Sequence, residues 1–276
     1  MPTARSVELR QLAQRVADAL PRPLVEEIVL TGSVSRGVAD DRSDIEMLVV
    51  TRDPQSLADC YVHAEQARLT DLASWGRQDT AARRVSGFRD GVPLELTWWH
   101  RAYAEEQVDA LLRGDMPTTA DALVHGVSLR SAGLLPRWQA RLREYPEELA
   151  AARIEDAALT WGGFAPAGVL TLTRPGERFA LLDRLLDDAG RIVQIVFALN
   201  RTWEPTHKRL AQRVEPLAVK PANLVPRIEA ALSELDPDRA ARIVAELQLE
   251  TVLLAPSGPN IDRARGWLAG VLAELP

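Results

Sequence analysis

Two carboxylates separated by one apolar residue are the feature of this sequence that most directly suggests chemistry. Asp44 and Glu46 flank Ile45 and lead into an apolar run that is typical of a buried strand. Side chains alternate between the two faces of a strand, so both carboxylates should share a face, roughly 6–7 Å apart, with Ile45 on the other face. Carboxylates arranged in this way can bind a hard cation such as Mg²⁺, which keeps water and phosphate oxygens as further ligands.

A loop of small residues precedes this acidic pair and offers groups that suit a phosphate. Gly32 has no Cβ, so a ligand can approach its backbone closely, and Ser33 offers a hydroxyl and an N–H group. A helix that begins near Ser33 would add free N–H groups and a favourable dipole. Arg36 could add positive charge or point to solvent. A Gly-Ser turn alone is common, but beside the acidic pair it predicts a phosphate–metal site.

A third carboxylate, Glu95, lies between two leucines in a β-type segment over residues 92–99. If this strand lies beside the strand of Asp44 and Glu46, the three carboxylates form an acidic triad. Glu95 would then be a third metal ligand or the general base for an attacking hydroxyl. The alternative is a solvated carboxylate at a sheet edge. The Arg83-Arg84 pair is expected at a solvated strand edge, with a contact to a triphosphate as the alternative.

The hydrophobic pattern predicts the elements that position these groups. Pro21 ends an early helix, Pro54 opens another, and Asp90-Gly91 is a strong hairpin signal. We expect helices over 7–20 and 54–72, and strands over 26–31, 45–51, 83–89 and 92–99. These strands should form a mixed sheet that brings the three carboxylates onto neighbouring strands.

The second half of the chain has a helical pattern. One wide apolar stripe over 181–199 predicts a long helix, and further helices are expected over 223–233, 238–250 and 260–274. A loop is expected at Gly162, Gly163, Pro166 and Gly168. The fold class is therefore α+β, with a mixed-sheet catalytic domain over 1–115 and an α-helical bundle domain over 116–276. An acceptor would bind in a cleft between the two domains.

Length and composition limit the classes of protein that fit. A chain of 276 residues with 46% apolar content suits two globular domains. The single cysteine, Cys60, excludes a disulfide framework. We expect a soluble cytoplasmic protein with no membrane partner, because no signal pattern and no apolar run near the roughly 20 residues of a span is present. The net charge of −6 argues against nucleic acid as a partner and suits a cationic small molecule.

A family resemblance rests on the ordered pattern Gly32-Ser33, Gly37, Ser43-Asp44-Ile45-Glu46 and Glu95. This pattern resembles the nucleotidyltransferase superfamily with the DNA polymerase β-like catalytic core, and within it the small bacterial group that includes the aminoglycoside adenylyltransferases. The segment 93–97 looks like the strand that carries the catalytic glutamate in streptomycin/spectinomycin-type enzymes. The segment 198–208 is similar to a helix end in the helical C-terminal domain of related proteins. The resemblance covers residues 25–100 well and 180–210 loosely.

The resemblance implies Mg²⁺-dependent transfer of AMP from ATP to an acceptor hydroxyl, with two Mg²⁺ ions between the carboxylates and the triphosphate. It implies Asp44, Glu46 and Glu95 as catalytic and metal-binding residues. The implied nucleotide-binding residues are Gly32, Ser33, Arg36, Ser43 and Lys208, of which the lysine would reach the triphosphate from the helical domain. Many members have Asp at the position of Glu46, and the longer side chain shifts the metal geometry.

We therefore expect an adenylyltransferase-type enzyme that modifies a small-molecule hydroxyl, with an aminoglycoside antibiotic as the candidate acceptor. A protein acceptor, as in an AMPylating antitoxin, is one alternative. A nucleotide-binding protein without turnover is the other, and the three intact carboxylates argue against it. Four tryptophans could line a pocket, with core packing as the default: Trp98, Trp99, Trp161 and Trp203.

Overall fold

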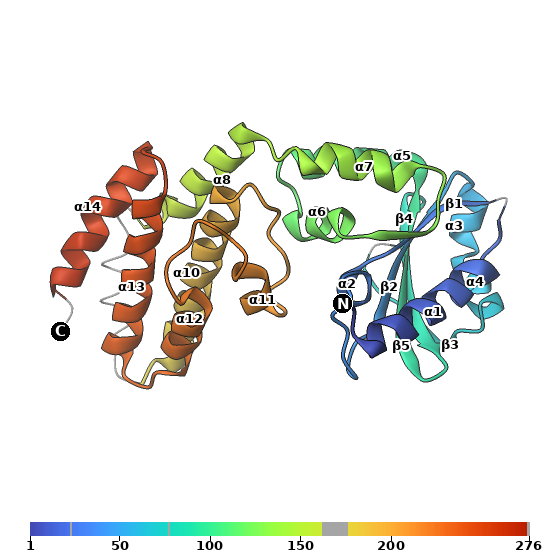
Figure 1. Ribbon diagram of the computed structural model, residues 1–276, viewed down its shortest axis with the longest axis horizontal. Helices are drawn as coiled ribbons and strands as arrows, with labels where there is room; N and C mark the ends of the chain where they lie inside the picture. The colour runs from blue at the N-terminus through green and yellow to red at the C-terminus, as the bar shows by residue number, and fades with distance from the viewer. Residues whose placement is uncertain (23, 77, 162–175, 275–276) are drawn as a thin grey trace. The chain divides into compact units, whose positions relative to one another are not determined.

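The computed structural model describes residues 1–22, 24–76, 78–161 and 176–274. The chain divides into two compact units, Met1–Glu144 and Tyr145–Pro276. In Figure 1 the first unit runs from blue to green and the second from yellow-green to red. The first unit contains a sheet with helices and the second contains helices, so the predicted α+β class is confirmed.

A mixed six-stranded sheet is the centre of the first unit, with the strand order β3-β4-β5-β2-β1-β6 (Figure 1). The strands are β1 Val25–Leu30, β2 Ile45–Thr51, β3 Thr70–Ser74, β4 Ala82–Arg89, β5 Val92–His100 and β6 Val127–Arg130. β2 and β5 pair in parallel, whereas the other neighbours are antiparallel. The four predicted strands and their neighbourhood are therefore confirmed.

The hairpin between β4 and β5 forms for a local reason. Asp90 and Gly91 both have positive φ, at 52° and 76°. A two-residue turn with positive φ at both positions matches the right-handed twist of the flanking strands, and Asp-Gly adopts it readily. This turn sets the register in which Arg84 lies opposite Thr97 and Ser86 lies opposite Glu95.

Alternating burial in the strands decides which face carries the acidic residues. Ile45, Met47 and Val49 are buried in the core of the first unit, and their partners on β5 are also apolar. Because side chains alternate, Glu46 and Glu95 must lie on the opposite face of the sheet. Both remain half-buried there.

The helices of the first unit are α1 Ala4–Ala19, α2 Gly32–Ser35, α3 Pro54–Ala58, α4 Cys60–Gln66, α5 Arg101–Leu112, α6 Pro117–Val124 and α7 Leu134–Arg143. The prediction of one helix over 54–72 was wrong. The helix divides at Asp59, which ends α3 and begins α4, and the chain enters β3 at Thr70. Aspartate competes for backbone groups and therefore favours helix ends over helix interiors.

A buried carboxylate attaches β6 and α7 to the sheet of the first unit. Glu27 on β1 is fully buried and accepts hydrogen bonds from Ser128 Oγ at 2.6 Å, Ala132 N at 2.8 Å and Leu134 N at 3.0 Å. These contacts draw the segment after α6 onto β1, so that β6 becomes the edge strand of the sheet. The first compact unit therefore extends to Glu144. The end of the catalytic domain near residue 115 stays a prediction.

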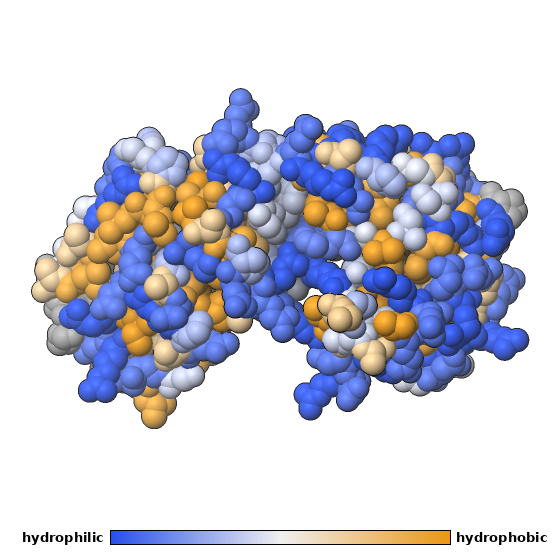
Figure 2. Space-filling view, viewed as in Figure 1, coloured by the Kyte–Doolittle hydropathy of each residue, from blue (hydrophilic) through white to orange (hydrophobic). Residues whose placement is uncertain are grey.

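The second unit is helical in its described residues. Its helices are α8 Glu147–Leu159, α10 Arg178–Leu199, α11 Leu210–Val214, α12 Leu224–Ser233, α13 Pro237–Leu254 and α14 Pro259–Glu274. The predicted long helix and the three later helices are confirmed. The loop expected at Gly162 to Gly168 lies outside the described residues. In Figure 2 hydrophobic residues gather over α13 and α14. On α13, Leu253 and Leu254 are exposed. Within the described residues, every helix is too short or too polar to span a bilayer.

Candidate active site

The parallel pairing of β2 and β5 places two of the predicted catalytic carboxylates side by side. Glu46 and Glu95 are direct partners in the register of these strands. Asp44 lies immediately before β2 and is also half-buried. The expected neighbourhood of the strands is therefore present, while the metal-binding and catalytic roles of the three residues stay predictions.

The small-residue loop lies directly against one of these carboxylates. Gly32 has a φ of +69°, and a Cβ at this position would overlap Oε2 of Glu46 and lie 3.1 Å from its Cδ. The backbone N–H of Thr31 donates to the carbonyl of Glu46 at 2.9 Å, which joins the loop to β2. The predicted phosphate loop and the predicted metal ligand are thus in contact.

The turn after Gly32 is held by its own residues. Ser35 Oγ donates to the Gly32 carbonyl at 3.0 Å, and Val38 N donates to the Ser33 carbonyl at 3.0 Å. The first N–H groups of a helical turn have no intrahelical acceptor, so they can donate to an external anion. This geometry suits the phosphate role predicted for Gly32 and Ser33.

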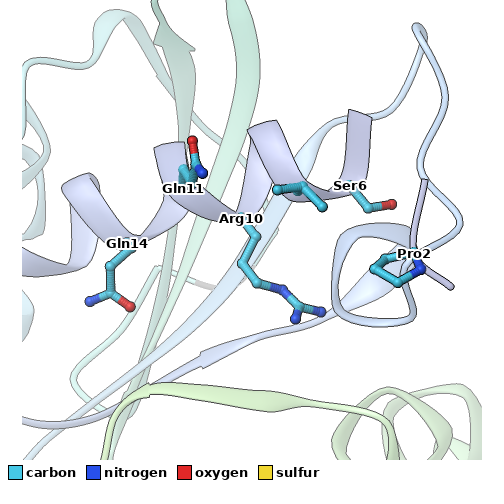
Figure 3. A pocket seen from close by; sticks show the side chains of 6 residues that line it. Pro2, Ser6, Arg10, Gln11 and Gln14 are labelled. Carbon is cyan, nitrogen blue, oxygen red and sulfur yellow. The ribbon is translucent and has the colours of Figure 1, made fainter. Parts of the chain in front are cut away.

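A pocket of about 320 Å³ lies behind this turn, along α1 (Figure 3). It is lined by Pro2, Ser6, Val7, Arg10, Gln11 and Gln14. The Arg10 guanidinium donates to the carbonyl of Ser35 at 3.0 Å, so it supports the far end of the turn. None of the six lining residues is a predicted site residue, and the pocket is therefore distinct from the carboxylates.

Arg36 and Ser43 have intramolecular partners. The guanidinium of Arg36 forms a salt bridge with the buried carboxylate of Asp121 on α6. The Ser43 hydroxyl donates to Asp40 Oδ1 at 3.0 Å and accepts from Asp40 N at 2.9 Å. Ser43 therefore shapes the turn that leads into Asp44. The nucleotide contacts predicted for both residues stay predictions.

Glu95 contacts Arg84, which was expected at a solvated strand edge or beside a triphosphate, and Thr97, for which no role was predicted. Arg84 Nε lies 3.1 Å from Oε1 of Glu95, and Thr97 Oγ1 donates to the same oxygen at 3.0 Å. The guanidinium carbon of Arg84 lies 4.0 Å from the ring centroid of Trp75. Side-chain alternation along β4 predicts that Arg84 and Ser86 share a face of the sheet. Only the register between β4 and β5 shows that this face also carries Glu95.

The donor set of the carboxylates fits Mg²⁺. Among the described residues, no group of three or more His, Cys, Asp or Glu side chains is gathered closely enough to hold a metal ion. Mg²⁺ needs only one or two protein carboxylates when phosphate oxygens and water complete its octahedral shell. Asp44, Glu46 and Glu95 carry hard oxygen donors of the kind that Mg²⁺ prefers, and Glu46 lies against the Gly32 loop.

Lys208 belongs to the second unit. It is exposed in the segment between α10 and α11. This segment is attached to α8 by Glu204, which pairs with Arg153 at 2.6 Å. The carboxylate of Glu204, 3.7 Å from Nε2 of His207, raises the pKa of that imidazole. The reach of Lys208 to a triphosphate, like the cleft between domains, stays a prediction.

The four tryptophans considered as pocket residues are all buried: Trp98, Trp99, Trp161 and Trp203. Trp203 packs against Tyr145 with ring centroids 4.6 Å apart, and Trp161 donates from Nε1 to the buried Asp188. These rings serve core packing in their own units. Trp75, by contrast, is 49% exposed.

Comparison with known proteins gives the class of the N-terminal region. Residues 9–117 match the family model described as "Nucleotidyltransferase domain". The match includes the Gly32 loop and all three carboxylates. The first unit therefore contains a region with the features of a nucleotidyltransferase domain.

Two solved structures are similar to the chain at low levels. A nucleotidyltransferase-like protein from Exiguobacterium sibiricum is 16% identical, with 98% of this chain and 75% of that chain covered and a TM-score of 0.30. Terminal uridylyl transferase 4 from Trypanosoma brucei, solved with bound GTP, is 15% identical, with 91% and 67% covered and a TM-score of 0.28. No curated protein matches the chain. Scores this low carry no argument about substrate or mechanism.

Proposed function

We propose that the protein is a Mg²⁺-dependent nucleotidyltransferase that transfers a nucleoside monophosphate, with AMP from ATP as the first candidate, to a hydroxyl of a small molecule. The observation that carries this proposal is the contact of the Gly32 loop with Glu46, whose partner on the adjacent strand is Glu95. The family match over residues 9–117 supports the reaction class.

The loop residues bind the triphosphate in this proposal. The backbone of Gly32 and Ser33 and the Ser33 hydroxyl donate hydrogen bonds to the β- and γ-phosphates. Arg10 and Ser35 keep the turn in place from behind. Lys208 adds positive charge at the leaving pyrophosphate, where charge builds in the transition state.

Asp44 and Glu46 would hold Mg²⁺, with Glu95 as a third ligand or as the base. When bound, the metal would stabilise the charge on the phosphoryl oxygens and on the leaving group. The Glu46 carboxylate lies against Gly32, and the Glu46 carbonyl accepts a hydrogen bond from Thr31 N. The carboxylate is thus positioned beside the place where the phosphates bind.

Glu95 activates the acceptor. The acceptor oxygen attacks the α-phosphorus, the bond from that phosphorus to the β-phosphate oxygen breaks, and pyrophosphate leaves. The hydroxyl proton passes to a carboxylate oxygen of Glu95. Arg84 and Thr97 contact Oε1, so Oε2 is the oxygen that takes this proton.

The chemical class of the acceptor is proposed from the charge of the chain and of the candidate site. The net charge of −6 and the acidic residues of the site favour a cationic molecule, because an acidic site attracts ammonium groups. An aminoglycoside is the first acceptor to test. A protein acceptor is tested in parallel by transfer of radiolabelled AMP to a protein band.

Calorimetric titration tests the proposal without knowledge of the acceptor. A non-hydrolysable α,β-methylene ATP analogue with Mg²⁺ is titrated into the wild type, Asp44→Asn and Asp41→Asn, with the GTP, CTP and UTP analogues as comparisons. We expect Mg²⁺-dependent binding to the wild type and to Asp41→Asn, which removes the same charge from an exposed neighbour. Binding should be lost in Asp44→Asn. A folded wild type that binds none of these nucleotides would overturn the proposal.

A further inference from the structure

The Arg84 side chain connects the exposed ring of Trp75 to the predicted base, Glu95. Trp75 is 49% exposed beyond the end of β3, and the Arg84 guanidinium lies over its ring at 4.0 Å. Arg84 Nε contacts Oε1 of Glu95 at 3.1 Å and Oγ1 of Thr97 at 3.2 Å. A guanidinium between an indole and a carboxylate is stabilised from both sides.

The strand register makes this arrangement a built feature of the sheet. Arg84 lies directly opposite Thr97 on β5 and diagonal to Glu95, so the side chains of Arg84, Thr97 and Glu95 share one face of the sheet. The side-chain amide of Gln78 donates to the carbonyls of Trp75 at 2.8 Å and of Arg84 at 2.9 Å. These bonds hold the residue that carries the indole close to β4.

Arg84 and Glu46 lie on opposite sides of Glu95. β5 has β4 on one side and β2 on the other, and Arg84 belongs to β4 while Glu46 belongs to β2. The carboxylate of Glu95 can therefore be drawn toward the guanidinium or toward a cation shared with Glu46. Arg84 retains a partner in either case, because its contact with Trp75 does not depend on Glu95.

We infer that Arg84 is a positioning residue that controls how far Glu95 is available as a metal ligand beside Glu46. Paired with Arg84, the carboxylate is held toward β4. When Arg84 rests on Trp75 alone, the carboxylate is released to act with Glu46 on a divalent cation. Arg84 thus lowers the affinity of the site for metal, and this inference rests on the proposed function.

Metal titration of the full chain tests this role. Mn²⁺ alone is titrated by calorimetry into the wild type, Arg84→Gln, Arg84→Lys and the control Arg15→Gln, which removes the same charge from an exposed position. Loss of the competing charge should tighten Mn²⁺ binding about tenfold in Arg84→Gln, a typical coupling between two sites. Arg84→Lys retains the charge, so its Mn²⁺ affinity should stay close to the weaker affinity of the wild type. Arg15→Gln should match the wild type.

Two further variants separate positioning from a general loss of charge. In a Glu95→Gln background, Arg84→Gln should no longer change Mn²⁺ affinity, because the carboxylate that links the two is neutral. Titration with Mg²⁺ should change the tryptophan fluorescence of the wild type, and Trp75→Phe should abolish that change.

The outcomes distinguish this inference from the proposed function. Wild-type Mn²⁺ binding that is unchanged or weakened in Arg84→Gln would overturn the inference alone. An effect of Arg84→Gln that persists in the Glu95→Gln background would also overturn it. Failure of every protein to bind Mn²⁺ or Mg²⁺ with nucleotide, although each is folded by circular dichroism, would overturn the proposed function and this inference with it.

Discussion

Gly32 lies so close to Glu46 that a methyl group on its Cα would overlap the carboxylate oxygen Oε2. Two independent reasons therefore require glycine here. The positive φ of +69° disfavours other residues, and the carboxylate fills the space of a side chain. The contact joins the predicted phosphate loop to the predicted metal ligand, although the two are separated by a turn and a loop in the sequence.

Gly32→Ala should abolish Mg²⁺–nucleotide binding, because the new methyl group must displace Glu46 or the loop. Gly91→Ala is the matched control, since Gly91 has a φ of +76° and open space around its Cα. Each variant should lose about 1 kcal/mol of stability from the strained backbone. Calorimetry with the ATP analogue and urea unfolding measure the two effects. Equal nucleotide affinities in the two variants would contradict the role of this contact.

Glu95→Gln should lower turnover by about 10²- to 10⁴-fold and leave nucleotide affinity nearly unchanged, as expected for loss of a general base. Release of pyrophosphate with an acceptor hydroxyl measures turnover, and calorimetry measures affinity. The exposed Glu8→Gln is the control. If Glu95→Gln instead loses nucleotide affinity and retains the rate at saturation, Glu95 serves mainly as a metal ligand.

Glu27→Gln should destabilise the first unit by roughly 1–3 kcal/mol, because an amide NH₂ would meet backbone N–H donors that now have a carboxylate acceptor. Hydrogen exchange at β1 and β6 and urea unfolding of the full chain measure the loss. Glu26→Gln is the control, since Glu26 pairs with the partly exposed Arg52 and Arg101. Its loss should stay below about 1 kcal/mol. Equal losses in both variants would argue against Glu27 as the anchor of β6.

The stability of the second unit should depend on His207. The Glu204 carboxylate, 3.7 Å from Nε2, raises the pKa of His207 above the ordinary value of 6.5. A folded-state pKa above the unfolded one means that this contribution is fully present below about pH 6.5 and lost as the pH rises through the raised value. Because the side chain is 58% exposed, the effect should be small.

Nuclear magnetic resonance titration of His207, together with urea unfolding at several pH values, checks this dependence. In His207→Gln the decline in stability above pH 6.5 should be weaker than in the wild type. A folded-state pKa at or below 6.5 would contradict the contact with Glu204.

Local patterns were sufficient for part of the fold. The Asp90-Gly91 turn, the alternation in β2 and β5, and the apolar stripe of α10 each act over a few residues. They could be predicted because one backbone preference or one buried face decides them. The prediction of one helix over 54–72 was wrong because it followed the apolar periodicity of the segment, whereas Asp59 ends the first helix and begins the second.

The strands β3 and β6 were not predicted from the sequence, because each depends on pairing with a neighbouring strand. β3 is short and mostly exposed, and it exists as the partner of β4. β6 is half-buried and lies against β1, where Glu27 binds the segment that follows it. β3 lacks the apolar alternation that marks a strand in a sequence, and β6 shows it over only four residues.

By itself, the sequence determined that Glu46 lies opposite the apolar core and that a glycine-serine turn precedes it, because strand alternation and turn chemistry are local. Only the tertiary structure decided that Glu46 lies beside Glu95, since parallel strands pair through a long crossover connection. It also decided that Arg84 reaches Glu95 from β4 and that Trp75, beyond the end of β3, lies against Arg84. Register across strands sets these contacts, and register depends on how the whole sheet packs.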